Sequence, residues 1–252
     1  MKVNGHFLSH VPAGTLARLH RMCAPMLAIF LLISLTAVPE ALARAGGGRN
    51  GGGGIVYLIL APFIIAYGMY VNRRINQKKQ QTEAAMARMA AKDAAWDETK
   101  LEAFVRTDFL RIQRAWCAKD RATLRARLTG SLLDNWLEQL AELQAQGHTN
   151  VMENLTLAQI RFVEAKDYAG TERDEFTVCL DARAVDYTVD AAGEIVDSNA
   201  TSRRARANKT KQEASFREFW TYYRKDEDWL LAKVDEADHW SDITNEPNVE
   251  AG

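Results

Sequence analysis

Residues 176–184 read Phe-Thr-Val-Cys-Leu-Asp-Ala-Arg-Ala, with apolar side chains at every second position. A period of two places alternate residues on opposite faces of an extended chain, so this stretch predicts a β-strand with one buried face. Tyr187 and Val189 extend the pattern to a turn sequence at 190–193 (Asp-Ala-Ala-Gly), after which 194–196 is expected to pair back as a hairpin.

The neighbouring segments carry the same period. Residues 155–162 alternate with one residue out of step, which predicts a strand containing a bulge. Residues 215–224 (Ser-Phe-Arg-Glu-Phe-Trp-Thr-Tyr-Tyr-Arg) predict a long aromatic strand. An acidic turn at 226–228 then leads to a closing strand at 229–234.

Upstream of Gly147 the period is helical. Apolar residues recur at three- and four-residue steps between Leu101 and Trp116, and Asp120 is placed to cap a second, short helix. Ser131 and Asp134 resemble a capping box at the start of a third helix. Helices followed by strands predict an α+β domain, with the N-terminal helices packed on a curved antiparallel sheet.

A second feature is the uncharged run at 55–71, Ile-Val-Tyr-Leu-Ile-Leu-Ala-Pro-Phe-Ile-Ile-Ala-Tyr-Gly-Met-Tyr-Val. Its length is near the lower limit for crossing a bilayer, and in lipid such a run satisfies its backbone groups only as a helix. The run is therefore predicted to be a transmembrane helix, the alternative being a buried helix of a soluble protein. The basic residues expected to hold its second end in the cytoplasm are Arg73, Arg74, Lys78 and Lys79.

Residues 1–45 are interpreted as a secretory signal peptide. Arg18 and Arg21 precede an apolar stretch at 22–38, and Ala41-Leu42-Ala43 is a cleavage-site sequence. The alternative keeps this segment as a first membrane helix that forms a hairpin with 55–71, and both interpretations leave the same final orientation.

The remaining boundaries follow from composition. Residues 46–54 form a glycine-rich loop, and 72–95 a helical or flexible stalk, interpreted as solvated. The domain covers 96–240, and 241–252 is expected to be a disordered tail. A chain beginning at Trp96 is expected to fold without the span.

Composition excludes several functional classes. The chain has 32 Lys and Arg against 33 Asp and Glu, so net charge gives no argument for nucleic acid. Three widely spaced cysteines indicate neither a disulfide framework nor a zinc site. Because a P-loop, a dinucleotide-binding sequence and metal-ligand spacing are all missing, no cofactor or metal is expected.

Five short motifs follow one another in an order that resembles the Tim44-like domain. They are Ala115-Trp116 with Asp120 and Leu124, 150–155 (Asn-Val-Met-Glu-Asn-Leu), 186–190 (Asp-Tyr-Thr-Val-Asp), 218–224 (Glu-Phe-Trp-Thr-Tyr-Tyr-Arg) and 229–231 (Trp-Leu-Leu). That domain is the C-terminal part of the mitochondrial inner-membrane import-motor scaffold and also occurs in bacterial membrane proteins. The resemblance covers roughly residues 96–237.

The resemblance implies a cone of helices over an antiparallel sheet, similar to nuclear transport factor two, with an apolar pocket. Relatives bind cardiolipin-rich membrane and recruit a chaperone, or dock ribosomes. Here a signal-like segment, a glycine run and a membrane span stand where the mitochondrial scaffold has its long chaperone-binding region. Membrane association is therefore expected, and chaperone recruitment is not.

Two groups of residues are candidates for binding. The first group consists of aromatic residues expected to line the pocket, namely Phe216, Trp220, Tyr222 and Trp229. The alternative for these residues is packing in the core. A basic loop between two strands is expected to bind anionic headgroups or ribosomal RNA, the alternative being a solvated flexible loop. Its cations are Arg203, Arg204, Arg206, Lys209 and Lys211.

The function expected from these features is a membrane-tethered scaffold or adaptor, not an enzyme. It would lie in a bacterial inner membrane as a single-pass protein after signal cleavage. Its cytoplasmic domain would bind anionic lipid, including cardiolipin, and a protein client in protein translocation or membrane-protein biogenesis; nucleic acid would be met only by docking a ribosome. The alternative is a small-molecule or isomerase/dehydratase-like pocket, with Asp181, Asp186 and Tyr187 as the acid/base groups.

Overall fold

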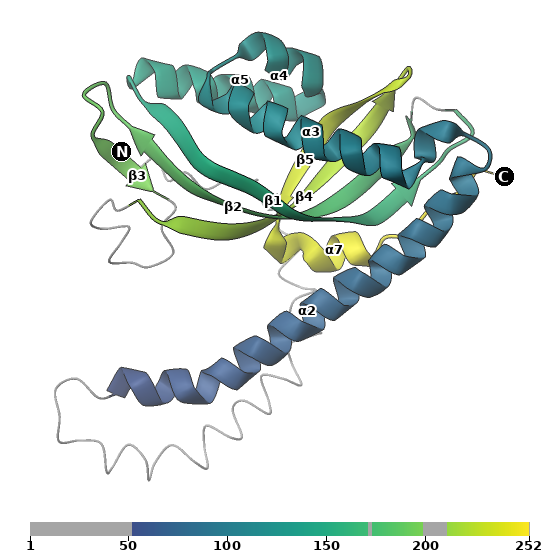
Figure 1. Ribbon diagram of the computed structural model, residues 1–252, viewed down its shortest axis with the longest axis horizontal. Helices are drawn as coiled ribbons and strands as arrows, with labels where there is room; N and C mark the ends of the chain where they lie inside the picture. Colours follow the sequence, from purple (N-terminus) through teal and green to yellow (C-terminus); the bar gives the residue numbers. More distant parts are fainter. Residues whose placement is uncertain (1–51, 171–172, 199–210, 252) are drawn as a thin grey trace. The chain divides into compact units, whose positions relative to one another are not determined.

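The computed structural model describes residues 52–170, 173–198 and 211–251, and for 52–59 it describes the backbone alone. The chain divides into two units, 1–68 and 69–252. The second unit contains the sheet and the helices that cover it (Figure 1). The expected signal segment at 1–45 and residues 46–51 of the glycine-rich loop lie outside the described residues.

The helices precede most of the sheet in sequence. They are α2 (Gly52–Ala90), the 3₁₀ turn η1 (Ala94–Trp96), α3 (Glu98–Cys117), α4 (Arg121–Arg127) and α5 (Gly130–Ala145). The strands are β1 (Thr149–Lys166), β2 (Glu175–Val189), β3 (Ile195–Ser198), β4 (Glu213–Lys225) and β5 (Asp228–Glu236). The 3₁₀ turn η3 (Ala237–His239) then leads into α7 (Trp240–Asn245).

The strands form one antiparallel sheet in the order β1-β2-β4-β5, with β3 beside β2. The predicted bulge in the first strand is confirmed, because the β1–β2 register shifts between Leu157 and Gln159. The predicted hairpin turn is confirmed as well: the Gly193 amide donates to the Asp190 carbonyl at 3.0 Å. Gly193 has φ +83°, a conformation that glycine adopts without strain. The α+β class expected from the change of period is therefore correct.

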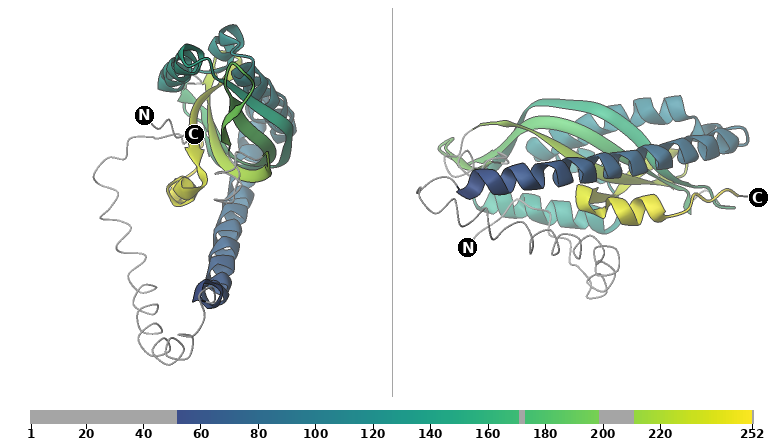
Figure 2. Two further views of the ribbon diagram at one scale, coloured as in Figure 1. Left: turned by 90° about the vertical axis from the view of Figure 1, so that its left-hand side faces the viewer. Right: turned by 90° about the horizontal axis from the view of Figure 1, so that it is seen from below.

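Alternate side chains of the central strands build the main core. Phe176 and Trp220 are fully buried, and Phe109 of α3 packs on Trp220 with ring centroids 5.0 Å apart. Helices α3, α4 and α5 cover this face of the sheet (Figures 1 and 2), which we call the front face. The period of two in the strands and the helical period upstream thus meet in one apolar layer.

The opposite, or back, face is covered by α7 and by residues 69–82 of α2. Its apolar contact is a smaller cluster made of Val71, Ile75, Val163, Cys179, Phe219, Trp240 and Ile243. Tyr70 packs edge-on against Trp240 at a centroid distance of 5.8 Å.

Four local expectations differ from the structure, and the first two concern helix starts. Helix α5 begins at Gly130 with Thr129 as its N-cap, so Ser131 lies inside the helix and the capping box is wrong. The last three glycines of the expected loop, 52–54, are helical because α2 begins at Gly52.

The segment interpreted as a solvated stalk packs on the domain. It is helical up to Ala90, and Met86 and Met89 are fully buried in the main core. Residues 241–252, expected to be disordered, contain most of α7, and the Val249 amide donates to the Ala165 carbonyl at 3.0 Å. Both segments bury few apolar side chains, which is why their composition indicated exposure.

Candidate functional site

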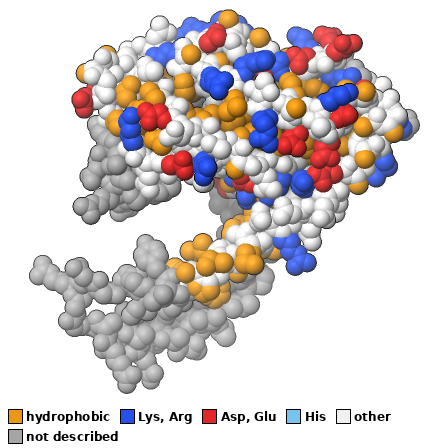
Figure 3. Space-filling model, viewed as in Figure 1, with side chains coloured by type: hydrophobic (Ala, Val, Ile, Leu, Met, Phe, Trp, Pro, Cys, Tyr) orange, Lys and Arg blue, Asp and Glu red, His pale blue; other side chains and the backbone are white. Residues whose placement is uncertain are grey.

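Helix α2 exposes apolar side chains in its first half. The large hydrophobic residues that are exposed among those described are Phe63, Ile64, Ile65, Tyr67, Met69, Tyr70 and, elsewhere, Tyr223. Consecutive helical residues project about 100° apart, so this part of α2 is apolar around its circumference. Figure 3 shows hydrophobic side chains gathered on this part of the helix. A helix of this kind is normally buried in a core or in a membrane.

Within the part of the chain whose side chains are described, no helix has an apolar stretch long enough to span a membrane. The predicted span at 55–71 is helical along its whole length, since α2 begins at Gly52. Its first five residues, 55–59, have no described side chains.

The basic residues that follow do not all face away from the protein. Arg73 is exposed, Lys79 pairs with Glu83 at 2.8 Å, and Arg74 donates to Asn245 Oδ1 at 3.1 Å. Lys78 is instead buried, and its Nζ donates to the Glu246 carbonyl. Burial lowers the pKa of Lys78, although the carboxylate of Glu164 opposes this shift. The prediction that Lys78 orients the helix in a membrane is therefore corrected: its side chain is directed at the back face of the sheet.

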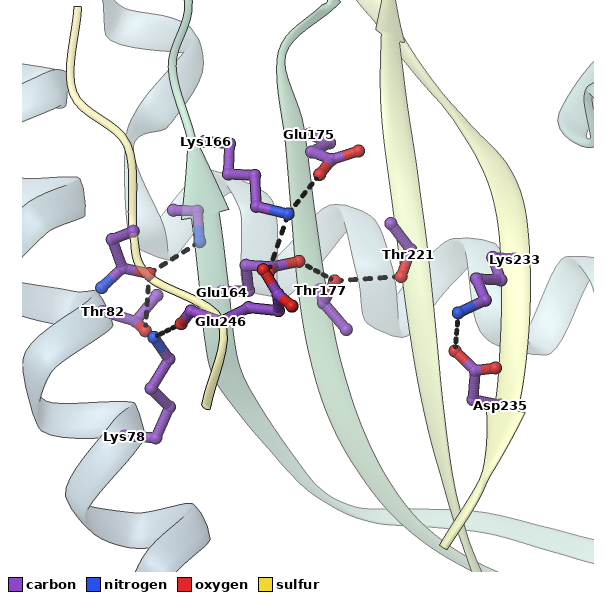
Figure 4. A network of polar contacts seen from close by, with 12 residues as sticks. Lys78, Thr82, Glu164, Lys166, Glu175, Thr177, Thr221, Lys233, Asp235 and Glu246 are labelled. Carbon is purple, nitrogen blue, oxygen red and sulfur yellow. Dashed lines mark hydrogen bonds and ion pairs between the residues drawn. The ribbon is translucent and has the colours of Figure 1, made fainter. Parts of the chain in front are cut away.

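Lys78 belongs to a polar network on that face (Figure 4). Lys166 Nζ lies 2.9 Å from Glu164 Oε1 and 2.8 Å from Glu175 Oε1. Thr177 donates to Glu164 at 3.0 Å, and the hydroxyls of Thr177 and Thr221 are 2.9 Å apart. Burial alone would lower the pKa of Lys166, but its bonds to Glu175 and Glu164 outweigh burial and raise it. The network keeps these partly buried charges paired.

Next to the network is a shallow hollow of about 300 Å³. Its charged lining consists of Lys166, Lys233, Glu164, Glu175, Asp235, Asp242 and Glu246. A second hollow, of about 390 Å³, is lined by α2 residues alone. Neither is the apolar pocket that the family resemblance implied.

The aromatic residues expected to line that pocket lie in the core. Trp220 and Tyr222 are completely buried, Trp229 is almost so, and Phe216 packs against the core while partly buried. Trp229 contacts Phe176 edge-on, with centroids 4.7 Å apart. None of the four lines either hollow. Their arrangement is that of core packing, the alternative given for them.

Most of the predicted basic loop lies outside the described residues, namely Arg203, Arg204, Arg206 and Lys209. Lys211 is described and exposed. Its Nζ lies 2.9 Å from Glu153 Oε1 and 4.4 Å from the centroid of the Tyr187 ring. Lys211 therefore contacts two strands of its own sheet.

The acid/base candidates are already bonded to other side chains. Asp181 accepts a hydrogen bond from Arg217 Nε at 2.6 Å and also pairs with Arg161, whose side chain is fully buried. Asp186 accepts from Asn150 at 2.7 Å, and burial raises its pKa. The ion pair of Asp181 with Arg217 could have been predicted from the pairing of β2 with β4, because the two residues stand opposite each other in its register.

One carboxyl that the pattern did not single out is Glu218. It lies on β4 directly opposite Glu236 of β5. Burial raises the pKa of Glu218 to about 7, against the opposing effect of the Trp220 Nε1 donor at 2.9 Å. The sequence did contain a signal for its burial, because residues an even number apart on a strand lie on the same face. Glu218 is two residues from Trp220 and four from Tyr222, both of which face the core.

Comparison with known proteins identifies the fold family. A family model described as the Tim44-like domain matches residues 82–236, well over half of the chain. The chain belongs to the Tim44-like domain family. The Tim44-like match begins inside α2 and ends with the last residue of β5, so the first part of α2 and the segment 240–251 lie outside it.

No curated protein matches the chain. Among solved structures, the intermembrane space region of the chloroplast protein ARC6 is similar, with 13% sequence identity and a TM-score of 0.37. The alignment covers 53% of this chain and 94% of that one.

Proposed function

We propose that this Tim44-like chain is a membrane-bound scaffold or adaptor, anchored by α2 and presenting its α+β domain to a protein client. The observation that carries the proposal is the exposure of apolar side chains in the first half of α2. Its side chains Phe63, Ile64 and Ile65 are exposed in succession around the helix. Family membership supports the same role.

The length and the flanks of the run fit an anchor. Residues 55–71 contain no charge, and at about 1.5 Å per residue they extend about 25 Å as a helix, close to the hydrocarbon thickness of a bilayer. Arg73, Arg74 and Lys79 follow immediately and place the domain on the cytoplasmic side. In this proposal the chain is a single-pass protein of a bacterial inner membrane, after removal of the signal segment.

Anionic lipid is the proposed second contact. The cations at 203–211 would each gain about 1 kcal/mol near anionic headgroups such as those of cardiolipin. The client is proposed to be a protein in translocation or membrane-protein biogenesis. Crosslinking in intact membranes followed by mass spectrometry would name it.

The anchor is tested with Ile64→Lys plus Ile65→Lys in the full chain. Each lysine at the centre of a span opposes insertion by about 2.5–3.5 kcal/mol. The unaltered chain should remain with membranes during alkaline carbonate extraction, and the variant should be released. The matched control is Gln80→Lys plus Gln81→Lys, which adds the same charge at exposed polar positions and should remain membrane-bound. Extraction of the unaltered chain, or retention of the variant, would contradict the anchor.

The lipid contact is tested separately by replacing Arg203, Arg204, Arg206, Lys209 and Lys211 with Ala. Flotation with cardiolipin-containing and with neutral vesicles should show weaker binding only to the cardiolipin vesicles, and raised salt should remove the difference. A control with five alanines at exposed cations of α3 and α4 would measure the effect of net charge alone. Equal flotation of both variants would remove the loop from the proposal.

A further inference from the structure

The segment Trp240–Ala251, which we call the clasp, runs along α2 (Figure 1). The polar contacts between α2 and the clasp are Arg74 with Asn245 Oδ1, Lys78 with the Glu246 carbonyl, Thr82 with Asn248 Oδ1 and Arg88 with Glu250. Just beyond the end of the helix, Lys92 donates to the Ala251 carbonyl. The first three helical positions are four residues apart and so form one stripe. The clasp therefore follows one side of the helix for several turns.

The same clasp is bonded to the sheet. The Val249 amide donates to the Ala165 carbonyl at 3.0 Å, and the Asp167 amide donates to the Val249 carbonyl at 2.9 Å. Asn248 Oδ1 accepts from the Ala165 amide at 3.0 Å and from Thr82 at 3.3 Å. Val249 thus pairs in parallel with Lys166 at the edge of β1. One short segment connects the helix and the sheet by hydrogen bonds to both.

The two layers of the domain differ in what holds them. The front layer packs through the main core, which includes Met86 and Met89 from the later part of α2. Residues 69–82 of α2 contribute Val71 and Ile75 to the small back-face cluster, and Tyr70 packs edge-on against Trp240. The segment is otherwise held by hydrogen bonds to the clasp and by the Arg161 guanidinium, which donates to Asn72 Oδ1 and Asn76 Oδ1. Segments with few buried apolar contacts open at lower free energy than the rest of a protein.

We propose that the clasp is a releasable fastening that holds residues 69–82 of α2 against the back face, and that it opens while the front layer stays folded. Met86 and Met89 remain in the core during this opening and act as the pivot. The released 14 residues would reach about 21 Å as a helix. If α2 is anchored as in the proposed function, opening changes the distance between the membrane and the domain. The fastening itself does not depend on the anchor.

Cys179 reports the open state. It is fully buried and belongs to the back-face cluster, alongside Val71, Ile75 and Trp240. Burial raises the pKa of its thiol to about 11, so alkylation in the closed state is slow. Opening of the layer removes the cover from this thiol.

The experiment measures alkylation of Cys179 by iodoacetamide, with peptide mass spectrometry, in the full chain purified in mild detergent. Asn248→Ala removes an acceptor of two hydrogen bonds and should accelerate the reaction about tenfold. Val249→Pro removes the amide bonded to Ala165 and should accelerate it at least as much. Asn135→Ala, the same change at an exposed position of α5, should leave the rate unchanged.

Hydrogen exchange in 101–116 of α3, measured in the same samples, separates local opening from unfolding. Unchanged exchange there, together with faster alkylation in both clasp variants, is the expected result. Unchanged alkylation in both variants, or acceleration of α3 exchange in step with alkylation, would overturn the fastening. Because the assay needs no membrane, a negative carbonate extraction together with a positive alkylation result would reject the anchor and leave the clasp standing.

Discussion

Glu218 links the packing of β4 to pH. Its carboxyl has a pKa of about 7 in the folded protein, mainly because of burial, and about 4.3 in an unfolded chain. Between these values the folded state holds more protons than the unfolded state. Stability supplied by this group is therefore present at low pH and is lost as pH rises towards 7.

We predict that Glu218→Gln is more stable than the unaltered chain above pH 7, by about 1–3 kcal/mol, because a neutral amide needs no proton to be buried. Urea unfolding at pH 5, 6, 7 and 8 measures the difference, which should vanish near pH 4. Glu227→Gln, an exposed turn position, is the control and should show no such trend. Equal stability of the Glu218 variant and the unaltered chain at pH 8 would contradict the prediction.

Residue-level chemistry was predictable only where both partners are close in sequence or paired by register. The Asp120 cap of α4 is an example, since its oxygen accepts from Ala122 and Thr123 within the next helical turn. The burial of Lys78 was not predictable, because its acceptor is 168 residues away on the clasp. A basic cluster after an apolar run looks the same in sequence whether or not one member turns towards a sheet.

At the scale of elements, Arg127 joins α3, α4 and β5. Its guanidinium lies 2.7 Å from Asp108 of α3 and 2.7 Å from Asp228, and it donates to the Trp229 carbonyl at 2.7 Å. Asp108 and Arg127 are both buried, whereas Asp228 is exposed. Burial raises the pKa of Asp108, and the charge of Arg127 opposes that shift.

We predict that Arg127→Met lowers the free energy of unfolding at pH 7 by about 3–5 kcal/mol, because Asp108 is left buried without its partner. Chemical unfolding followed by tryptophan fluorescence measures this. The loss should shrink as pH falls, since protonation removes the unpaired charge.

The double variant Arg127→Met with Asp108→Leu should recover most of that stability, because no unpaired buried charge is left at this site. Arg125→Met, on the same helix but exposed, is the matched control. A loss as large in the double variant as in the single one would contradict the role given to the pair.

The elements themselves were predictable where the period of apolar residues was strong, as in α3 and in β2. The docking of α2 was not predictable, because Val71, Ile75, Met86 and Met89 form a narrow and interrupted stripe in a polar segment. The prediction of a disordered tail at 241–252 was wrong for a related reason. The structure of this segment depends on hydrogen bonds to Ala165 and to α2, and such bonds produce no periodic pattern in the sequence.

At the scale of the whole molecule, these contacts move the boundary of the folding unit. The domain was expected to begin at Trp96, yet Met86 and Met89 lie in the main core, and the clasp bonds to α2 as far upstream as Arg74. A chain starting at Trp96 loses all of these contacts. A chain starting at Met69 keeps them, because the second unit begins there.

We predict that a chain of residues 69–252 unfolds with the same free energy as the full chain, whereas 96–252 is less stable by about 3–6 kcal/mol, from the lost burial of two methionine side chains at about 1.5–3 kcal/mol each. Urea unfolding by tryptophan fluorescence compares the three chains in the same detergent. Because domains commonly have only about 5–15 kcal/mol to lose, the shorter chain should also show faster exchange throughout the sheet. Equal stability of the two truncated chains would place Met86 and Met89 outside the folding unit. Equal stability of 69–252 and the full chain would mean that the exposed apolar half of α2 contributes nothing to folding. Its apolar side chains would then be explained by a contact outside the domain.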